Sequence, residues 1–367
     1  VSAHKDDAES DTAAVSVTEN GGAYTATVHF CRLVLTAPIG SAITASCGDA
    51  TLTATITGSD ETGSVTLYPP TLGSWTITAT KGDDSTSEVI NATEYKDYTL
   101  TLDYVNPVLD KNEWKVIKKV ADADKGANYW AVGDTKRITL NGKVGAYTFS
   151  NFNVDVFILG FNHNSTKEGT HRIHFLLGKI GGKFVGLVDS YYDPSGYTTT
   201  SGAFTMNTSD TNSGGWAKTQ MRSTVLGAAS DPTNPTANTL LAALPADLRA
   251  VMKSVTKYTD NTGGGSNSAS AVTATTDYLW LLAEFEVFGS RTYANSSEPS
   301  SQAQYEYFKA GNSKIAYKHS AAETAAAWRL RSPASTNTTT FCAVDSGGGA
   351  DNYNANRSLA LVPGFAA

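Results

Sequence analysis

The chain has 367 residues, of which 17% are charged, and 35 acidic residues against 28 basic ones give a net charge of -7. This length exceeds what one hydrophobic core organises, which predicts at least two domains. A negative net charge repels polyanions and argues against nucleic acid as a partner. The longest apolar run, around residues 154–161, is too short to span a bilayer, so no membrane partner is expected.

The first 30 residues are predicted to be an N-terminal linker segment. Asp6, Asp7, Glu9 and Asp11 make its first part acidic, and its first 20 residues lack apolar periodicity. No chemical role follows from this segment.

Residues 31–105 are predicted to form a small β-sandwich, because apolar and polar residues alternate in short runs between Gly and Pro turns. The expected strands are residues 33–35, 43–45, 52–56, 65–67, 75–78 and 98–102. The segment TLYPPTLGSWTITATKG resembles the immunoglobulin-like or prealbumin-like modules of phage tail and bacterial surface proteins. We expect an immunoglobulin-like spacer rather than a binding module.

The three cysteines, Cys31, Cys47 and Cys342, are too few and too scattered for a disulfide framework or a zinc site. Buried thiols are the preferred interpretation, since free cysteine is among the most buried residue types. A disulfide between Cys31 and Cys47 is the alternative.

Residues 112–367 are predicted to form a second, α+β domain, which follows a change of composition at residues 103–110. A Gly181-Gly182 pair predicts a hairpin turn. Helices are predicted at residues 240–255, where apolar residues recur every three or four positions, and at residues 301–310. Strands are predicted at residues 114–117, 129–132, 137–140, 155–159 and 183–188.

Two groups of side chains raise the question of catalysis or metal binding. Glu284 and Glu286 lie in a predicted strand, where they share one face as a glycosidase carboxylate pair would. A sheet with one polar side is the simpler interpretation. His171 and His174 are three residues apart and point to opposite faces of a strand, so they cannot chelate one ion together with His163. We expect no catalytic residue, no metal and no other cofactor.

The segment from Ser332 to the C-terminus contains no Lys, Glu, Gln, Met or Trp, although Lys and Glu recur earlier in the chain. It is framed by WRLRSP at residues 328–333 and LVPGF at residues 361–365, which are typical of core strands. This frame argues against a disordered tail.

The second domain contains seven motifs that are informative together: WAVGD (130–134), MRS (221–223), LPADL (244–248), EFEV (284–287), QYEYF (304–308), WRLRSP (328–333) and VPGF (362–365). Together they resemble a family of unknown function that is common in phages of gut bacteria, the variable proteins of diversity-generating retroelements. Members often carry an Asn-rich stretch around Phe-Cys-x-Val, a frame that residues 341–344 keep. Adenine-directed mutagenesis of Asn codons cannot produce Lys, Glu, Gln, Met or Trp, which explains the missing residue types. Ala327 departs from the pattern, since relatives often have Trp there.

The resemblance implies a C-type-lectin-like fold with a ligand-binding variable region at about residues 337–360. Tyr353 is the expected anchor, because a large rigid ring contributes contact area at low entropic cost. Small side chains at positions 343, 347 and 349 suggest a groove. The implied contact residues are Thr339, Thr340, Ala343, Asp345, Gly347, Gly349, Asp351, Asn352, Tyr353, Asn354, Asn356, Arg357 and Leu359.

The residues around these positions are expected to support them. Ala343, Asp345, Gly347 and Gly349 alternate with Val344, Ser346, Gly348 and Ala350, so the first set is expected to face solvent. The expected scaffold is Trp328, Leu330, Phe341, Val344, Val362 and Phe365.

These patterns predict an extracellular phage virion protein, in a tail fibre or another receptor-binding position, whose partner is a bacterial surface protein or glycan. A homo-oligomer is expected, with a trimer preferred, because several weak sites together gain avidity. Two alternatives are a glycan-modifying enzyme that uses Glu284 and Glu286, and a purely structural decoration of the virion.

Overall fold

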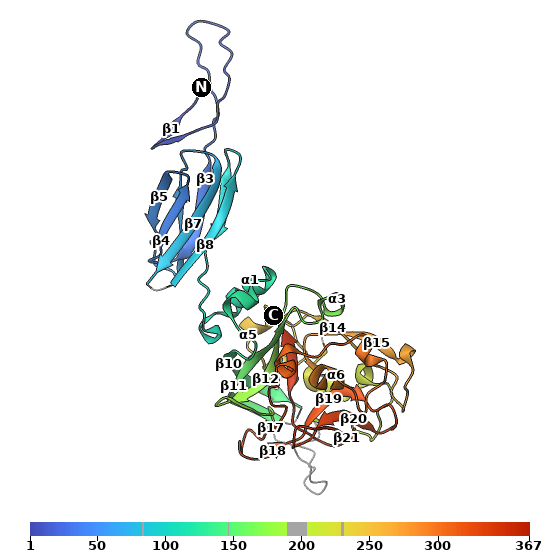
Figure 1. The fold of residues 1–367 in the computed structure, drawn as a ribbon. Helices are drawn as coiled ribbons and strands as arrows, with labels where there is room; N and C mark the ends of the chain where they lie inside the picture. The colour runs from blue at the N-terminus through green and yellow to red at the C-terminus, as the bar shows by residue number, and fades with distance from the viewer. Residues whose placement is uncertain (83, 146, 189–203, 229–230) are drawn as a thin grey trace. The chain divides into compact units, whose positions relative to one another are not determined.

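The computed structural model describes residues 1–82, 84–145, 147–188, 204–228 and 231–367. The chain divides into two compact units, Val1–Asn106 and Pro107–Ala367. Strands form several sheets in both units, and most of the strand pairs are antiparallel (Figure 1). No helix among the described residues is both long enough and apolar enough to cross a membrane.

The first 30 residues of the first unit contain little regular structure. They form one short hairpin, β1 (His4–Lys5) with β2 (Ala8–Glu9), and an isolated bridge between Ser10 and Phe30.

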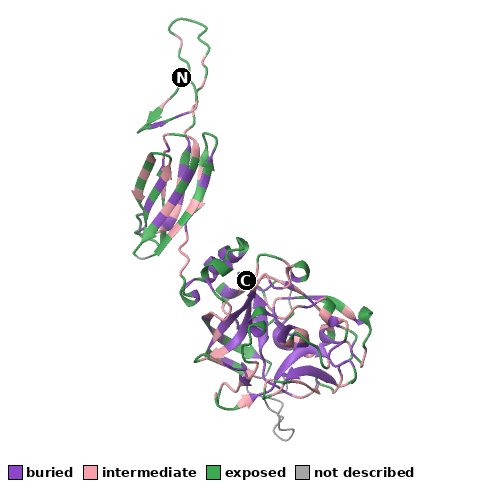
Figure 2. Ribbon diagram, viewed as in Figure 1, coloured by how far each residue is buried: buried purple, intermediate pink, exposed green. Residues whose placement is uncertain are grey.

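The rest of the first unit has two sheets that share one core. Buried Leu33 and Leu35 come from one sheet, and buried Ile43, Trp75 and Ile77 come from the other. Buried and exposed residues alternate along these strands, as Figure 2 shows. The three-stranded sheet has the order β6 (Thr62–Leu67), β3 (Arg32–Pro38), β9 (Asp97–Thr101), and the four-stranded sheet has the order β5 (Ala50–Thr55), β4 (Ala42–Cys47), β7 (Gly73–Lys81), β8 (Asp84–Ala92).

Each predicted strand of this region overlaps one of the observed strands, so the strand positions predicted from the alternation of apolar residues are confirmed. The sequence missed β8, where most residues carry hydroxyl or charged side chains and only Ile90 and Ala92 are buried. Cys31, Cys47 and Cys342 are free thiols, and Cys31 and Cys342 are buried as expected.

The second unit is organised around a six-stranded sheet. Its last strand, β22, pairs with both β12 and β16 and therefore places the C-terminal residues inside the sheet. There Phe365 stacks on Phe175 with ring centroids 5.1 Å apart. The strand order is β10 (Thr135–Val144), β11 (Tyr147–Phe161), β12 (Ile173–Ile180), β22 (Pro363–Ala366), β16 (Trp280–Leu281), with β13 (Lys183–Phe184) also paired to β12.

Smaller elements surround this sheet. The helices are η1 (Leu109–Lys111), α1 (Trp114–Asp122), α2 (Gly126–Tyr129), α3 (Ser165–Glu168), η3 (Trp216–Lys218), η4 (Met221–Leu226), α4 (Leu240–Ala243), α5 (Ala246–Arg249), η5 (Ala269–Ala271), α6 (Glu284–Phe288), η6 (Glu298–Ser300) and α7 (Glu306–Lys309). The remaining strands are β14 (Val255–Asp260) with β15 (Val272–Asp277), β17 (Ala316–Tyr317) with β18 (Ala325–Ala326), and a three-stranded sheet of β19 (Trp328–Pro333), β20 (Thr340–Val344) and β21 (Ala350–Asn354).

The hairpin predicted at Gly181 and Gly182 is confirmed, since these residues join β12 to β13. Their φ angles of 57° and 80° lie in the left-handed region, which glycine adopts without a steric penalty. The strands predicted at residues 137–140 and 155–159 are also confirmed, within β10 and β11.

The strand predicted at residues 114–117 is wrong, because these residues begin α1. Trp114, Ile117 and Ala121 are buried at spacings of three and four, so the same apolar residues also fit a helix face. The strand predicted at residues 129–132 is wrong as well, since α2 ends at Tyr129 and residues 130–132 belong to no strand.

The helices predicted at residues 240–255 and 301–310 are shorter than expected. Leu244 is extended with ψ 151° before Pro245, and a residue before proline disfavours the helical conformation. The first segment therefore breaks into α4 and α5, and its last residue, Val255, already belongs to β14. In the second segment only Glu306–Lys309 is helical.

Candidate functional site

The predicted contact residues lie on the hairpin of β20 and β21 and on the chain that follows it. β20 is the middle strand of its sheet, with β19 on one side and β21 on the other. Phe341 pairs with Tyr353, and Ala343 pairs with Asp351. We call residues 339–359 the hairpin surface.

The turn of the hairpin is held by its own aspartate. The Asp345 carboxylate accepts hydrogen bonds from the backbone N–H groups of Gly347 and Gly349, both at 2.8 Å. Gly348 has a φ of 86°, a conformation that favours glycine. The turn geometry therefore depends on Asp345 and on the glycine at position 348.

Arg329 in β19 supports the hairpin surface from inside the molecule. Its guanidinium is fully buried and donates to four backbone carbonyl groups. The acceptors are the carbonyl oxygens of Phe341 at 3.4 Å, Tyr353 at 2.9 Å, Asn354 at 3.1 Å and Arg357 at 3.0 Å. A guanidinium presents five donors in a fixed plane, so one side chain fixes the backbone of both strands and the next turn.

Asn212 supports the start of the hairpin surface in the same manner. Its buried side-chain amide donates to the carbonyl oxygens of Asn337 at 2.7 Å and Thr340 at 2.9 Å. Its amide oxygen accepts from the backbone N–H of Gly264 at 2.7 Å. Sequence reasoning missed both Arg329 and Asn212, because a single polar residue carries no pattern that reports its burial.

Most predicted contact residues are at least partly accessible, and three are buried. Gly347 and Gly349 are exposed. Thr340, Ala343 and Leu359 are buried. The partly exposed residues are Thr339, Asp345, Asp351, Asn352, Tyr353, Asn354, Asn356 and Arg357.

The expectation that Ala343 faces solvent is wrong. All five residues of β20 are buried, because the strand lies between two others and both of its faces are covered. Ala343 packs with Ala327 and Leu359 in a small apolar cluster against which Tyr353 also packs. The scaffold prediction is confirmed, since Trp328, Leu330, Phe341, Val344, Val362 and Phe365 are all fully buried.

The predicted strand that carried Glu284 and Glu286 is also wrong. Only Trp280 and Leu281 are in a strand, and the two glutamates lie in the first turn of α6. The Glu286 carboxylate accepts from the backbone N–H of Ala283 at 2.9 Å, which helps to begin the helix there. Both glutamates are fully buried.

Groups of the protein itself donate hydrogen bonds to each of these carboxylates. Glu284 accepts from the backbone N–H groups of Tyr293 and Ala294. Glu286 forms a two-point ion pair with Arg331, at 2.5 and 2.8 Å. Burial opposes ionisation of Glu286, but Arg331 and Lys257 outweigh it and hold the pKa of this carboxyl well below its usual range.

The sequence raised the possibility of a metal site at three histidines, but the structure brings together a different set of possible ligands. His163, Glu168 and Glu286 have side-chain donor atoms within 4.8 Å of one another. The ammonium of Lys257 already lies among them, 2.6 Å from Glu168 and 3.1 Å from Glu286. A cation beside this ammonium would be repelled, so the donor set fits a metal poorly. His171 is exposed and does not join this cluster.

Glu298 is a further buried acid that the sequence did not single out. It accepts hydrogen bonds from the Asp260 backbone N–H at 2.9 Å and the Ser332 hydroxyl at 2.6 Å. Burial raises the pKa of Glu298 to about 7, and these hydrogen bonds offset only part of that effect.

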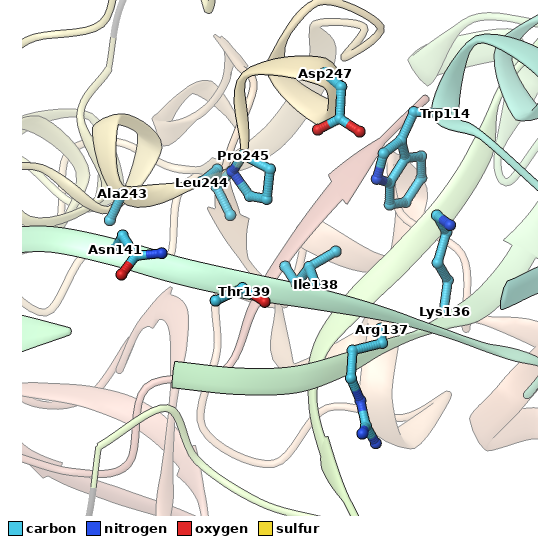
Figure 3. Close-up of a pocket in the computed structure, with 10 residues that line it drawn as sticks. All are labelled: Trp114, Lys136, Arg137, Ile138, Thr139, Asn141, Ala243, Leu244, Pro245 and Asp247. Carbon is cyan, nitrogen blue, oxygen red and sulfur yellow. The ribbon is translucent and has the colours of Figure 1, made fainter. Parts of the chain in front are cut away.

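A cleft of about 390 Å³ lies beside β10, and Figure 3 shows its lining. None of its lining residues belongs to the hairpin surface. The hairpin surface and this cleft are therefore separate parts of the second unit.

Comparison with known proteins gives one match. Residues 205–366 match a domain of unknown function, DUF6273. No curated protein and no solved structure matches the chain. The matched region contains β19, β20 and β21, and it also contains the buried, ion-paired residues Lys257, Glu286 and Arg331.

Proposed function

We propose that this chain is a receptor-binding protein of a phage virion, in a tail fibre or a comparable position. It binds a bacterial surface protein or glycan through the hairpin surface. The proposal gives residues 112–367 a C-type-lectin-like fold and residues 31–105 the role of an immunoglobulin-like spacer. It also includes a homo-oligomer, with a trimer preferred, because repeated weak sites gain avidity.

One observation carries the proposal: the hairpin surface is held through its backbone. Arg329 and Asn212 bind carbonyl oxygens, which every residue type provides. Side chains at positions 351–357 can therefore change without loss of these supports. A fixed backbone with replaceable side chains is what a variable binding surface requires.

The residue types of the segment support the same function. The absence of Lys, Glu, Gln, Met and Trp after Ser332 fits adenine-directed variation of Asn codons. Tyr353 is partly exposed next to Asn352 and Asn354, so an aromatic ring and hydrogen-bonding amides are available to a ligand.

The enzyme alternative finds no support in the arrangement of Glu284 and Glu286. A glycosidase needs two carboxyl groups that reach the sugar, whereas these two are fully buried and hydrogen-bonded to the protein.

The proposal predicts that Tyr353→Ala weakens attachment to host cells. We expect a loss of roughly tenfold or more, as for an aromatic anchor of an interface. The measurement is flow cytometry of the fluorescently labelled full chain on a panel of fixed gut bacterial strains. Because Tyr353 also packs on Ala327 and Leu359, Asn356→Ala and Arg357→Ala are measured as well, since both residues are partly exposed and lie outside this apolar cluster.

Tyr129→Ala is the matched control, since Tyr129 is a 39% exposed tyrosine outside the hairpin surface. Equal binding by the wild type and all three site variants would favour the structural-decoration alternative. Loss of binding by Tyr129→Ala to the same degree would also count against the hairpin surface as the site.

A further inference from the structure

The cleft beside β10 lies at an open edge of the central sheet. β10 is the first strand in the sheet order and pairs only with β11 among the strands of the described residues. An edge strand presents backbone groups that another chain can pair with unless something covers them.

The direction of these backbone groups follows from one backbone hydrogen bond and from the register of β10 and β11, in which Arg137 lies opposite Asp155 and Thr139 opposite Asn153. Arg137 and Thr139 reach across to Asp155 and Asn153 of β11, each at 2.7 Å. The backbone N–H of Arg137 does not point to β11 but donates to the Asp110 carboxylate at 2.7 Å. In an antiparallel pair these directions alternate, so the N–H and C=O of Thr139 also point away from β11. Thr139 lines the cleft (Figure 3).

The open part of the edge is short. Asp110 covers the strand edge at Arg137, and Ala243 of α4 lies against the edge at Gly142. The register of the β10 and β11 pair also shifts next to Gly142. The stretch between these two positions accommodates about three residues of an added strand.

The opposite wall of the cleft is formed by Trp114 and by the chain between α4 and α5. Pro245 is partly exposed and gives this wall an apolar part, and the buried Leu244 lies next to it (Figure 3). Asp247 on the same wall is exposed, and among the described residues its carboxylate has no ion-pair partner within 4.0 Å. The wall therefore offers an apolar contact and an accessible negative charge.

We propose that this cleft binds a short extended polypeptide of a partner protein by strand addition to β10. The backbone of the added segment pairs with Thr139. An apolar side chain packs on the partly exposed Pro245, and a basic side chain two residues further along faces the same wall and meets Asp247. This site is independent of the hairpin surface and does not rest on the function proposed for it.

A sugar fits the cleft less well. Sugars usually pack on an open aromatic face, whereas Trp114 is only 2% exposed. Its ring has the Lys136 ammonium at 5.5 Å and packs edge-on against Phe175 and Phe365. The backbone edge and the carboxylate remain the accessible features.

The test uses the full chain with 5-fluorotryptophan at each of its 6 tryptophan positions, observed by fluorine NMR. Trp114→Phe identifies the resonance of Trp114. The probe is acetyl-Thr-Val-Thr-Lys-amide. We expect a saturable shift of the Trp114 resonance with a Kd on the order of 1 mM. A copy of the peptide N-methylated at its two central residues should cause no shift, because it cannot donate to the strand edge.

Charge reversal is the matched comparison. A peptide with Glu in place of Lys should bind the wild type roughly tenfold more weakly, and Asp247→Lys should reverse that preference. Asp247 is exposed, so this variant leaves the core intact. The proposal is overturned if no peptide moves the Trp114 resonance up to about 10 mM. Equal binding of the N-methylated peptide, or a shift caused by N-acetylglucosamine and not by the peptides, would overturn it too.

Discussion

Single buried polar residues decide how the second unit is held together. Two positive and two negative side chains form a buried cluster of ion pairs, which consists of Arg331, Glu286, Lys257 and Glu168. Removal of one partner would leave an uncompensated charge in the interior. Glu298 differs from this cluster, because hydrogen bonds rather than an ion pair satisfy its carboxyl group.

Glu298 predicts a pH dependence of stability. Its pKa is about 7 in the folded chain against 4.5 as the ordinary value, so the folded state binds the proton more tightly than the unfolded state. The contribution of this group to stability is therefore fully present below pH 4.5 and is lost as the pH rises through 7. As the pH rises across this range, we expect the free energy of unfolding of Glu298→Gln to increase by up to about 3 kcal/mol relative to that of the wild type.

The measurement is urea unfolding of the wild type and Glu298→Gln at several pH values between roughly 5 and 8, because the proton of Glu298 is released in this range. The difference between their unfolding free energies is the quantity of interest, because it cancels other titrating groups. Parallel stability curves for the two proteins would show that Glu298 does not titrate in this window.

At the scale of elements, the β20 and β21 hairpin depends on its turn. The five residues from Asp345 to Gly349 return the chain between the strands, and Asp345 satisfies two of their backbone N–H groups. Gly347 and Gly348 are adjacent but not equivalent, since only Gly348 has a φ in the left-handed region. A Cβ atom at position 348 would also lie 3.0 Å from the Ile315 side chain.

This difference predicts that Gly348→Ala is more damaging than Gly347→Ala. We expect an additional loss of about 1–2 kcal/mol in unfolding free energy, from backbone strain and from the contact with Ile315. Chemical denaturation of both variants measures the difference. Gly347→Ala is the matched control, and equal stabilities would mean that the turn does not need the left-handed conformation.

At the scale of the whole molecule, the chain has two units with separate cores. The core of Val1–Asn106 includes Trp75, Leu33 and Ile43 and draws its buried residues from its own two sheets. A substitution in this core should therefore act on the unfolding of the first unit.

We expect Trp75→Phe to lower one calorimetric transition by about 4–24 °C and to leave a second transition in place. Loss of packing volume around a fully buried tryptophan costs roughly 1–3 kcal/mol, which is a shift of about 4–8 °C per kcal/mol in a domain of this size. The measurement is differential scanning calorimetry of the full chain, with Trp328→Phe as the counterpart in the second unit. A single transition that moves as a whole in both variants would contradict this prediction.

Features that depend on local pattern could be predicted from the amino-acid sequence. Alternation located the strands of the first unit, a Gly-Gly pair located the turn after β12, and apolar residues such as Phe341 and Phe365 identified the buried scaffold. These predictions succeeded because each strand of the first unit has one face toward a core and one toward solvent.

Features that depend on distant neighbours became visible only in the folded chain. Ala343 is buried because Ala327 and Leu359 pack against it, and Glu286 pairs with Arg331 and Lys257 because separate elements bring them together. The spacing of residues along the chain reports one face of one element. It does not report what a distant segment places against that face, and this is why the supports of the hairpin surface were found only in the fold.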